Sequence, residues 1–335
     1  MLSQGPILST DAEKVTDAAD APFLEPVTQQ FVDAVALAGG PPIYTLSPAD
    51  ARKLLTDIQA TEVGKPAVRL EDTAFPVGPT GSVRIRVIQP EGATEALPVV
   101  MYVHGGGWIL GDTGTHDRLV REIAVGARAA LFFVDYDRAP EARYPVAIEQ
   151  IYAATRFVVE HGARLGVDPT RLAIVGDSVG GNMAAAVTLM AKERRGPKID
   201  LQVLFYPVTG CDFDTASYAT FTNGPWLTKP AMEWFWDAYL PDEAARKQIT
   251  ATPLSAAVDQ LTGLPDAVVI VAENDVLRDE GECYARKLSQ AGVRVTCTRY
   301  NGTIHDFVML NALADTPAVR GAIAQAIAAL KSVLE

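Results

Sequence analysis

The segment Gly176-Asp177-Ser178-Val179-Gly180 constrains the possible fold more than any other part of this chain. It follows the apolar run 172–175 and precedes the alanine-rich run 182–192, so it predicts a tight turn between a strand and a helix. Side chains two positions either side of the serine would collide in such a turn, so both positions require glycine. This pattern is typical of a nucleophile elbow, in which the hydroxyl of Ser178 stands above the sheet edge and the amide of Val179 points at a developing oxyanion. The alternative is an ordinary glycine-rich connection.

A second glycine-rich segment, His104-Gly105-Gly106-Gly107-Trp108, ends the apolar run 98–103. Because glycine has no Cβ, the backbone amides of such a loop are unshielded, and two N–H groups can reach one oxygen atom. The composition is that of the oxyanion loop of lipases and esterases. A flexible glycine turn is the alternative. We expect His104 to be structural and to hold the loop by hydrogen bonds.

A serine nucleophile needs a base, and the chain offers four histidines besides the elbow. His161 lies in a polar helix end and is expected to be solvated, and His116 precedes a helical run or lines the rim of the pocket. His305 follows the alternating strand 293–300, where a base would reach the carboxyl edge of a sheet. We therefore predict His305 as the base, with an ordinary hydrogen-bonded loop histidine as the alternative.

The base also needs a carboxylate to hold its tautomer. The apolar run 267–272 is followed by Glu273, Asp275 and Asp279. Glu273 is too close to the strand end, and an acid at 279 in a first helical turn has a structural explanation in the helix dipole. Asp275 is the predicted carboxylate. The order Ser178, Asp275, His305 along the chain is the one that the α/β-hydrolase arrangement requires.

Hydrophobic patterning predicts strands alternating with helices. The expected strands are 67–75, 82–88, 97–103, 129–134, 171–175, 201–206, 266–272 and 293–299, and the expected helices are 116–128, 145–164, 179–194, 279–291 and 316–334. Such alternation predicts an α/β fold with a mostly parallel, doubly wound, eight-stranded sheet and a ligand site at the carboxyl ends of the strands.

Together these motifs resemble the hormone-sensitive-lipase-like branch of the α/β-hydrolases, the bacterial family IV esterases, over residues 45–330. The matching pieces are the elbow with Gly181-Asn182, the loop 104–108, the segment Asp275-Val276-Leu277-Arg278-Asp279-Glu280-Gly281, the Gly-x-x-His loop 302–305, and Asp135-Tyr136-Asp137-Arg138-Ala139-Pro140-Glu141, which is similar to the family's Tyr-Arg-Leu-Ala-Pro-Glu box. The resemblance implies Ser178 as nucleophile, His305 as base and Asp275 as its orienting acid. It implies an oxyanion hole formed by the amides of Gly106, Gly107 and Val179.

Three positions depart from the family pattern. Val179 stands where alanine is usual, Asp306 stands where glycine follows the base, and Asp137-Arg138 replaces Arg-Leu. A β-branched side chain at 179 would narrow the pocket. A carboxylate at 306 would raise the pKa of His305 if it turned inward, but we expect it to be exposed to solvent.

Two segments do not fit the alternation of strands and helices, and the resemblance implies that they form a helical cap. They are residues 1–50, which precede a catalytic domain at 51–335, and an insertion at about 209–250 within it. The insertion is rich in aromatic residues, most of which are expected to pack between helices. Trp226, in the turn 223–226, is predicted to contact substrate, as is Trp108 beside the oxyanion loop.

Composition narrows the function classes. The formal net charge of −12 argues against nucleic acid or an anionic membrane as a partner. Three cysteines at unpatterned spacings predict free thiols in a reducing compartment, and no signal peptide or membrane span is recognisable, so a cytoplasmic location is expected. No metal or organic cofactor is called for, and a homodimer is compatible with the sequence.

The predicted activity is a serine carboxylester hydrolase that cleaves short- to medium-chain acyl esters through an acyl-enzyme. An amidase or arylformamidase with the same triad is one alternative. A non-catalytic small-molecule receptor on the same fold is another. Such a receptor has no use for a base, so His305 argues against it.

Overall fold

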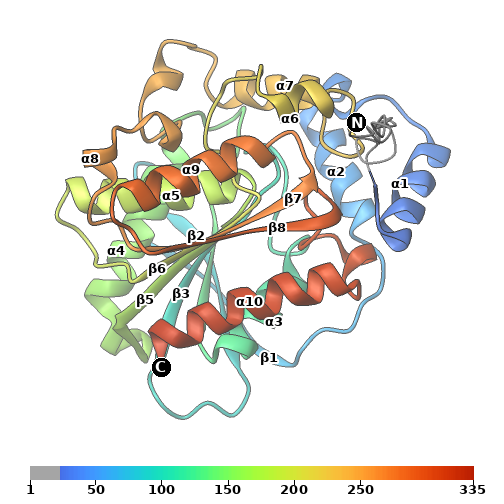
Figure 1. Ribbon diagram of the computed structural model, residues 1–335. Helices are drawn as coiled ribbons and strands as arrows, with labels where there is room; N and C mark the ends of the chain where they lie inside the picture. Colours follow the sequence, from blue (N-terminus) through green and yellow to red (C-terminus); the bar gives the residue numbers. More distant parts are fainter. Residues whose placement is uncertain (1–22) are drawn as a thin grey trace, which may run out of the picture.

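The computed structural model describes residues 23–335, which fold around one eight-stranded sheet with helices on both faces (Figure 1). The strands are β1 (Val68–Phe75), β2 (Val83–Pro90), β3 (Leu97–Val103), β4 (Ala130–Asp135), β5 (Val167–Asp177), β6 (Leu201–Phe205), β7 (Asp266–Asn274) and β8 (Val295–Ile304). Their order across the sheet is β1-β2-β4-β3-β5-β6-β7-β8. β2 is antiparallel to both β1 and β4, and the other neighbours are parallel. The predicted mostly parallel eight-stranded sheet is confirmed.

Helices cover both faces of this sheet. They are α1 (Pro26–Ala38), α2 (Pro48–Ile58), α3 (Asp117–Ala127), α4 (Val146–Leu165), α5 (Val179–Glu193), α6 (Ala216–Thr220), α7 (Lys229–Tyr239), α8 (Val258–Leu261), α9 (Arg278–Gln290) and α10 (Pro317–Leu334), with short 3₁₀ turns η1 (Ile43–Thr45), η2 (Ala245–Lys247), η3 (Pro253–Ser255) and η4 (Asn311–Leu313). α3 and α10 pack together on one face, whereas α4, α5 and α9 cover the other (Figure 1). Among residues 23–335, no helix is both long and apolar enough to cross a bilayer.

Two strands differ from their predicted bounds by more than two residues at one end. β5 begins at Val167 rather than 171, because residues 167 and 168 pair with the start of β3 across an irregularity in register. Asp168-Pro169-Thr170 carries no apolar alternation, so patterning did not reveal this extension. β8 continues to Ile304, which pairs with Asn274. The segment 301–304, predicted as a loop, therefore belongs to the sheet and carries the following residue directly to its carboxyl edge.

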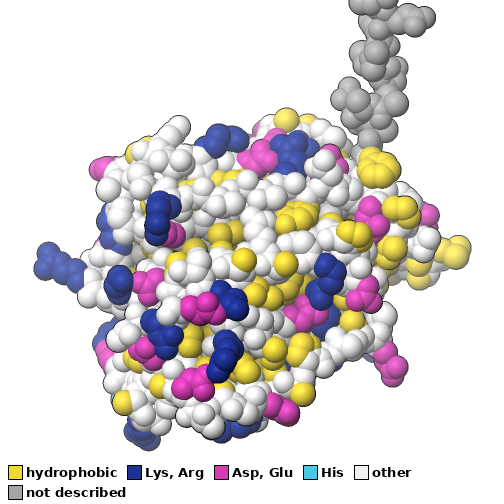
Figure 2. Space-filling model, turned by 60° about the horizontal axis from the view of Figure 1, so that its bottom comes forward, with side chains coloured by type: hydrophobic (Ala, Val, Ile, Leu, Met, Phe, Trp, Pro, Cys, Tyr) yellow, Lys and Arg dark blue, Asp and Glu magenta, His cyan; other side chains and the backbone are white. Residues whose placement is uncertain are grey.

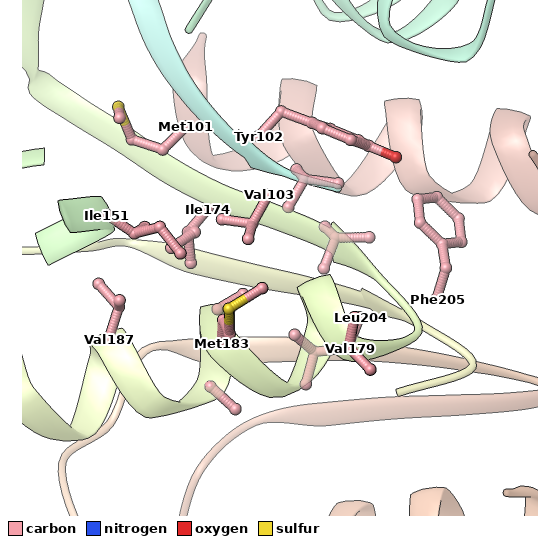
Figure 3. Packing of buried hydrophobic residues seen from close by; sticks show 14 of the residues in the cluster. Met101, Tyr102, Val103, Ile151, Ile174, Val179, Met183, Val187, Leu204 and Phe205 are labelled. Atoms are coloured by element: carbon pink, nitrogen blue, oxygen red, sulfur yellow. The ribbon is translucent and has the colours of Figure 1, made fainter. Parts of the chain in front are cut away.

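The helix that follows the elbow is surrounded by core. Every residue of α5 from Val179 to Ala191 is buried, and all seven residues of β3 are buried as well. Figure 3 shows Val179, Met183 and Val187 on this helix facing Ile174 of β5 and Val103 of β3. Its glycines and alanines allow close approach to the strands. The elbow is therefore built on a fully buried part of the core.

The segments predicted as a cap come together at one end of the sheet. α1, η1 and α2 lie beside α6 and α7, and α7 contacts η1 (Figure 1). Helix starts here are well capped, since the Ser47 side chain accepts from Asp50 N and the Thr228 side chain accepts from Ala231 N. Residues 1–22 of the first predicted segment lie outside the described residues, and the predicted boundary at 50 falls inside α2. The division into cap and catalytic domain stays a prediction.

Charged residues of both signs are mixed on the face drawn in Figure 2, where dark blue and magenta side chains alternate around small yellow areas. The described residues form many ion pairs, such as Arg320 with Glu122 and Arg171 with Asp168. This face therefore presents no continuous basic patch of the kind that binds a phosphate backbone.

Candidate active site

The turn at Ser178 has the strained geometry of an elbow. Ser178 directly follows β5 and is the N-cap residue of α5, with φ 54° and ψ −122°, a conformation that non-glycine residues rarely adopt. A Cβ at Gly176 would come within 2.3 Å of the carbonyl oxygen of Gly180, and one at Gly180 within 2.0 Å of the carbonyl oxygen of Val103. Glycine is therefore obligatory at both positions. Backbone bonds from Ser178 N to Phe205 O (2.8 Å) and from Val208 N to Ser178 O (3.1 Å) hold the turn in place.

The three predicted triad side chains meet at the carboxyl edge of the sheet. Nε2 of His305 lies 2.9 Å from Oγ of Ser178, and its Nδ1 lies 2.7 Å from Oδ2 of Asp275. The three residues follow β5, β7 and β8, whose carboxyl ends converge here. Asp275 is itself oriented, because its Oδ1 accepts the amide hydrogen of Leu277. With the Nδ1 proton directed at Asp275, the Nε2 lone pair is left to accept the proton of Ser178.

The two competing carboxylates have other partners. Glu273 Oε2 accepts from the amide of Gly302 at 2.6 Å and so holds the end of β8 rather than the imidazole. Asp279, in the first turn of α9, accepts from Ser217 N at 2.8 Å and pairs with Arg278. Both therefore have structural contacts that explain them without a role at the base.

The three predicted oxyanion donors have no hydrogen-bond acceptor among the described residues. Gly106 and Gly107 adopt φ of 101° and 60°, and both line the same cavity as Ser178. Within residues 23–335, neither their amides nor that of Val179 donates a hydrogen bond. A Cβ at Gly107 would lie 2.1 Å from the ring of Phe235, so this glycine lets α7 approach the loop. Unpaired amides beside a serine hydroxyl are what an oxyanion hole requires.

Sequence reasoning missed the group that holds this loop, Asp177. Its Oδ1 accepts from Gly105 N at 3.0 Å and from the hydroxyl of Tyr102 at 2.7 Å, while its Oδ2 lies 3.2 Å from Nε2 of His116. Burial alone would raise the pKa of Asp177, but His116 and Tyr102 reverse this and lower it. The sequence does offer a clue to this role, because Asp177 directly precedes the buried Ser178 and a buried charge requires a partner.

Two histidine predictions need correction. His116 neither lines the pocket nor faces solvent, because it lies fully buried beneath the oxyanion loop as the partner of Asp177. Burial lowers its pKa, but Asp177 outweighs this and raises it. His161 is half-buried rather than solvated, since its ring stacks on Phe157 with centroids 4.2 Å apart. His104 is structural as expected: Nδ1 lies 2.8 Å from Gly105 O, and burial lowers its pKa to about 4.

The predicted substrate contact at Trp108 is also wrong. The residue is 1% exposed and lies outside the cavity lining, stacked on Tyr239 with ring centroids 4.3 Å apart and packed against Trp236. With φ 60°, its backbone turns the side chain behind the glycines and under α7. Val179 does not narrow the pocket either. Its side chain is fully buried in the core under the elbow, as Figure 3 shows.

Trp226 and Asp306 lie together in the cavity wall. The indole N–H of Trp226 donates to Oδ2 of Asp306 at 3.0 Å, and its ring packs on Phe31 of α1 with centroids 5.3 Å apart. The side chain of Asp306 is only 16% exposed, and its Oδ1 lies 3.4 Å from Nε2 of His305. The expectation of a solvent-exposed carboxylate at 306 is therefore wrong. Burial lowers the pKa of His305, but Asp275 and Asp306 outweigh this and raise it to about 9.

In the third departure from the pattern, Arg138 donates to the carbonyl oxygen of Gly111 at 2.6 Å, and Asp137 is bonded to Gln150. Neither residue lines the cavity, so this departure leaves the site unchanged.

A cavity of about 370 Å³ lies over the nucleophile. Its lining is apolar apart from the catalytic edge, and it comes from both cap segments and from the sheet loops: Val35, Ala36, Gly39, Gly40, Pro41, Pro42, Ile43, Tyr44, Leu54, Leu55, Ile58, Gly106, Gly107, Leu110, Ser178, Pro225, Trp226, Leu227, Thr228, Ala231, Met232, Phe235, His305, Asp306 and Met309. In the described part of the chain, no cluster of three or more His, Cys, Asp or Glu side chains is arranged to hold a metal ion.

Comparison with known proteins places this site in a family. A sequence model of the alpha/beta hydrolase fold family matches residues 100–309. Carboxylesterase NlhH of Mycobacterium tuberculosis is 36% identical over 318 residues, 93% of this chain and 97% of that protein. The crystal structure of a thermostable esterase from Pseudomonas putida is 50% identical, covering 94% of this chain and 99% of that chain with a TM-score of 0.92. A fungal esterase structure from Rhizomucor miehei is 38% identical, covering 93% and 97% with a TM-score of 0.87. The chain therefore belongs to the alpha/beta hydrolase fold family, and within it to the hormone-sensitive-lipase-like esterases.

Proposed function

We propose that this esterase hydrolyses carboxylic esters of short- to medium-chain acyl groups through an acyl-enzyme on Ser178. The observation that carries the proposal is the hydrogen-bonded chain from Ser178 through His305 to Asp275, at the floor of an apolar cavity and beside three amides without partners. A nucleophile, a base, an acid and an oxyanion hole within one small volume are the components of acyl transfer.

In the first half of the reaction, His305 Nε2 takes the proton of Ser178 as its Oγ attacks the ester carbonyl carbon. The carbonyl oxygen becomes an oxyanion and receives hydrogen bonds from the amides of Gly106, Gly107 and Val179. Each such donor typically contributes about 3 to 4 kcal/mol at the transition state. The imidazolium, stabilised by Asp275, then gives its proton to the departing alcohol, which leaves an acyl group on Ser178. Water repeats the sequence and releases the acid.

The cavity lining supports the choice of a small-molecule ester with an apolar acyl group. Leu54 and Ile58 of α2 and Met232 and Phe235 of α7 provide apolar walls. The charged side chains in the lining are His305 and Asp306, both at the catalytic edge. The remainder of the cavity therefore offers no partner for a charged acyl chain, and burial of methylene groups is its main source of binding energy.

The test is a substrate panel on the wild-type protein and on Ser178→Ala. We expect turnover of p-nitrophenyl esters, little or no turnover of p-nitroanilides and formyl-kynurenine, and a loss in kcat on the order of 10⁶-fold in the variant. A p-nitrophenyl phosphonate should inactivate the wild type and appear by mass spectrometry on the peptide containing Ser178. An adduct on another serine would contradict the assignment of Ser178, and faster turnover of an anilide than of the ester would contradict the proposed ester substrate.

We also propose that the protein works in a reducing compartment, the cytoplasm. All three cysteines lie within the described residues, and none of Cys211, Cys283 and Cys297 forms a disulfide. The homodimer stays a prediction, which light scattering of the purified protein would decide. Recovery of the protein outside the cell would contradict the cytoplasmic assignment.

A further inference from the structure

Asp306 is a second carboxylate at the base that the three-residue triad does not use. It follows His305 with φ 63°, in the left-handed region where glycine is usual and aspartate is among the better tolerated side-chain residues. Its Oδ1 approaches Nε2 of His305, the nitrogen that also faces Ser178, while Asp275 occupies the opposite nitrogen.

Trp226 holds this carboxylate in place. Its indole N–H donates to Oδ2 of Asp306, so the oxygen nearer to His305 remains directed at the imidazole. Trp226 in turn packs on Phe31 of α1. The position of Asp306 therefore depends on both segments that lie over the cavity, as well as on the loop that carries the base.

Other ionisable groups surround the pair without occupying this position. Asp275 and Asp177 are both buried and raise the pKa of His305, and the ring of Tyr206 stands edge-on to the imidazole with centroids 4.9 Å apart. Asp306 itself is influenced by Asp177 and Asp275, and it acts in turn on the buried His116. Of these groups, only Asp306 shares the cavity wall with the base.

We propose, building on the proposed function, that Asp306 is a positioning residue for the base, and that its carboxylate, held by Trp226, stabilises the imidazolium formed when Ser178 gives its proton to Nε2. The Ser178 O–H bond breaks, the Nε2–H bond forms, and the new positive charge lies between the carboxylates of Asp275 and Asp306. The oxygen of the departing alcohol then receives this proton, which returns the imidazole to its neutral form.

The carboxylate of Asp306 also affects His305 in the free enzyme. A carboxylate beside Nε2 favours the protonated imidazole before substrate arrives, and protonated His305 cannot act as a base. The pKa of His305, raised to about 9 by Asp275 and Asp306 against the effect of burial, agrees with this geometry. Burial raises the pKa of Asp306 as well, whereas His305 and the hydrogen bond from Trp226 oppose this. We therefore expect the base to be neutral only at a higher pH than an ordinary histidine requires.

The experiment follows the pH dependence of kcat/KM for p-nitrophenyl butyrate and of the rate of phosphonylation of Ser178. In Asp306→Asn, the midpoint of the acid limb should move to lower pH by about 1 pH unit or more, because a charge a few ångströms away shifts a pKa by about 1 to 3. On the alkaline plateau the rate should fall several-fold, since the imidazolium loses one of its two carboxylates. Asp306→Gly keeps the left-handed backbone and should give the same shift.

A second variant removes only the hydrogen bond from Trp226 to Asp306. Trp226→Phe keeps the aromatic packing and removes the N–H, so it should move the midpoint in the same direction by a smaller amount. The matched control for Trp226→Phe is Trp234→Phe, which changes a tryptophan of α7 that lies outside the cavity lining. The matched control for Asp306→Asn is Asp315→Asn, which removes an exposed carboxylate that follows His305 in the sequence. Neither control should move the midpoint.

An unchanged midpoint in both folded Asp306 variants, with circular dichroism like that of the wild type, would overturn the proposal. So would an equal shift in Asp315→Asn, which would indicate a general effect of net charge. These outcomes leave the proposed function intact as long as Ser178→Ala is inactive and Ser178 takes the phosphonyl label. If instead Ser178→Ala keeps its activity, the proposed function fails first.

Discussion

At the residue scale, the choice between Asp275 and Glu273 gives a sharp prediction. Asp275 contacts Nδ1 of His305, whereas Glu273 accepts the amide of Gly302. Asp275→Asn should lower kcat by about 10⁴-fold, because the amide favours the wrong imidazole tautomer. Glu273→Gln retains an oxygen for Gly302 and should cost less than about tenfold. Steady-state kinetics on both variants checks this, and a reversal of the two effects would mean that the carboxylate is misassigned.

The pH dependence of the wild-type enzyme is a second prediction for single residues. The base must be neutral, so kcat/KM should rise with pH through the pKa of His305 and then reach a plateau. Because Asp275 and Asp306 raise this pKa against the effect of burial, to about 9, the midpoint should lie above the value of about 6.5 of an ordinary histidine. Rates measured across the acid and alkaline range check this. A midpoint at or below 6.5 would contradict the placement of the two carboxylates.

At the scale of elements, hydrogen bonds connect the first turn of α9 to the first residues of the insertion 209–250. The buried carboxyl of Glu280 accepts from Thr209 N at 2.6 Å and from Gly210 N at 3.1 Å, and Thr209 Oγ1 donates to the backbone oxygen of Glu280. Its other oxygen, Oε2, has no partner among the described residues. Burial raises the pKa of Glu280 to about 8, although the two backbone amides oppose this. A neutral carboxyl therefore fits this junction better than a charged one.

This junction predicts a pH-dependent stability. The pKa of Glu280 is raised above its unfolded value of 4.5, so its contribution to stability is complete below that pH and is lost as pH rises through about 8. Glu280→Gln keeps the acceptor oxygen and cannot ionise. Its free energy of unfolding in urea should match that of the wild type near pH 4 and exceed it by a few kcal/mol near pH 9. A constant difference at both pH values would mean that Glu280 does not titrate between them.

At the scale of the whole molecule, the cavity between the cap segments and the sheet predicts an optimum acyl length. Each methylene buried against residues such as Leu54, Met232 and Phe235 contributes about 0.8 kcal/mol until the cavity of about 370 Å³ is full. Longer chains must displace these side chains, at a cost of about 1 to 3 kcal/mol. We expect kcat/KM for p-nitrophenyl esters to peak between about butyrate and hexanoate.

Trp108 and Val179 are both buried outside the cavity lining, so we expect the aromatic segment 209–250, through Phe235, to set the limit on acyl length. Phe235→Ala should therefore move the optimum to longer chains, because it enlarges the cavity from α7. The same panel of esters measures this shift. A kcat/KM that keeps rising to palmitate in the wild type, or that jumps when the ester forms an emulsion, would instead indicate an interfacial lipase.

The sequence by itself determined the eight strands, the helices that match α3, α4, α5, α9 and α10, their order, and the three residues that meet at the carboxyl edge of the sheet. These depend on local rules: the steric need for glycine at 176 and 180, the periods of strands and helices, and the convergence of parallel strand ends. The sequence did not assign the individual helices within 26–58 and 216–261. Only the tertiary structure decided which way side chains near the site face. Trp108 packs against α7, and His116 is buried beside Asp177. Asp306 faces the cavity because it accepts a hydrogen bond from Trp226, which lies 80 residues earlier in the chain. Such orientations depend on partners distant in sequence, so neither periodicity nor motif spacing could reveal them.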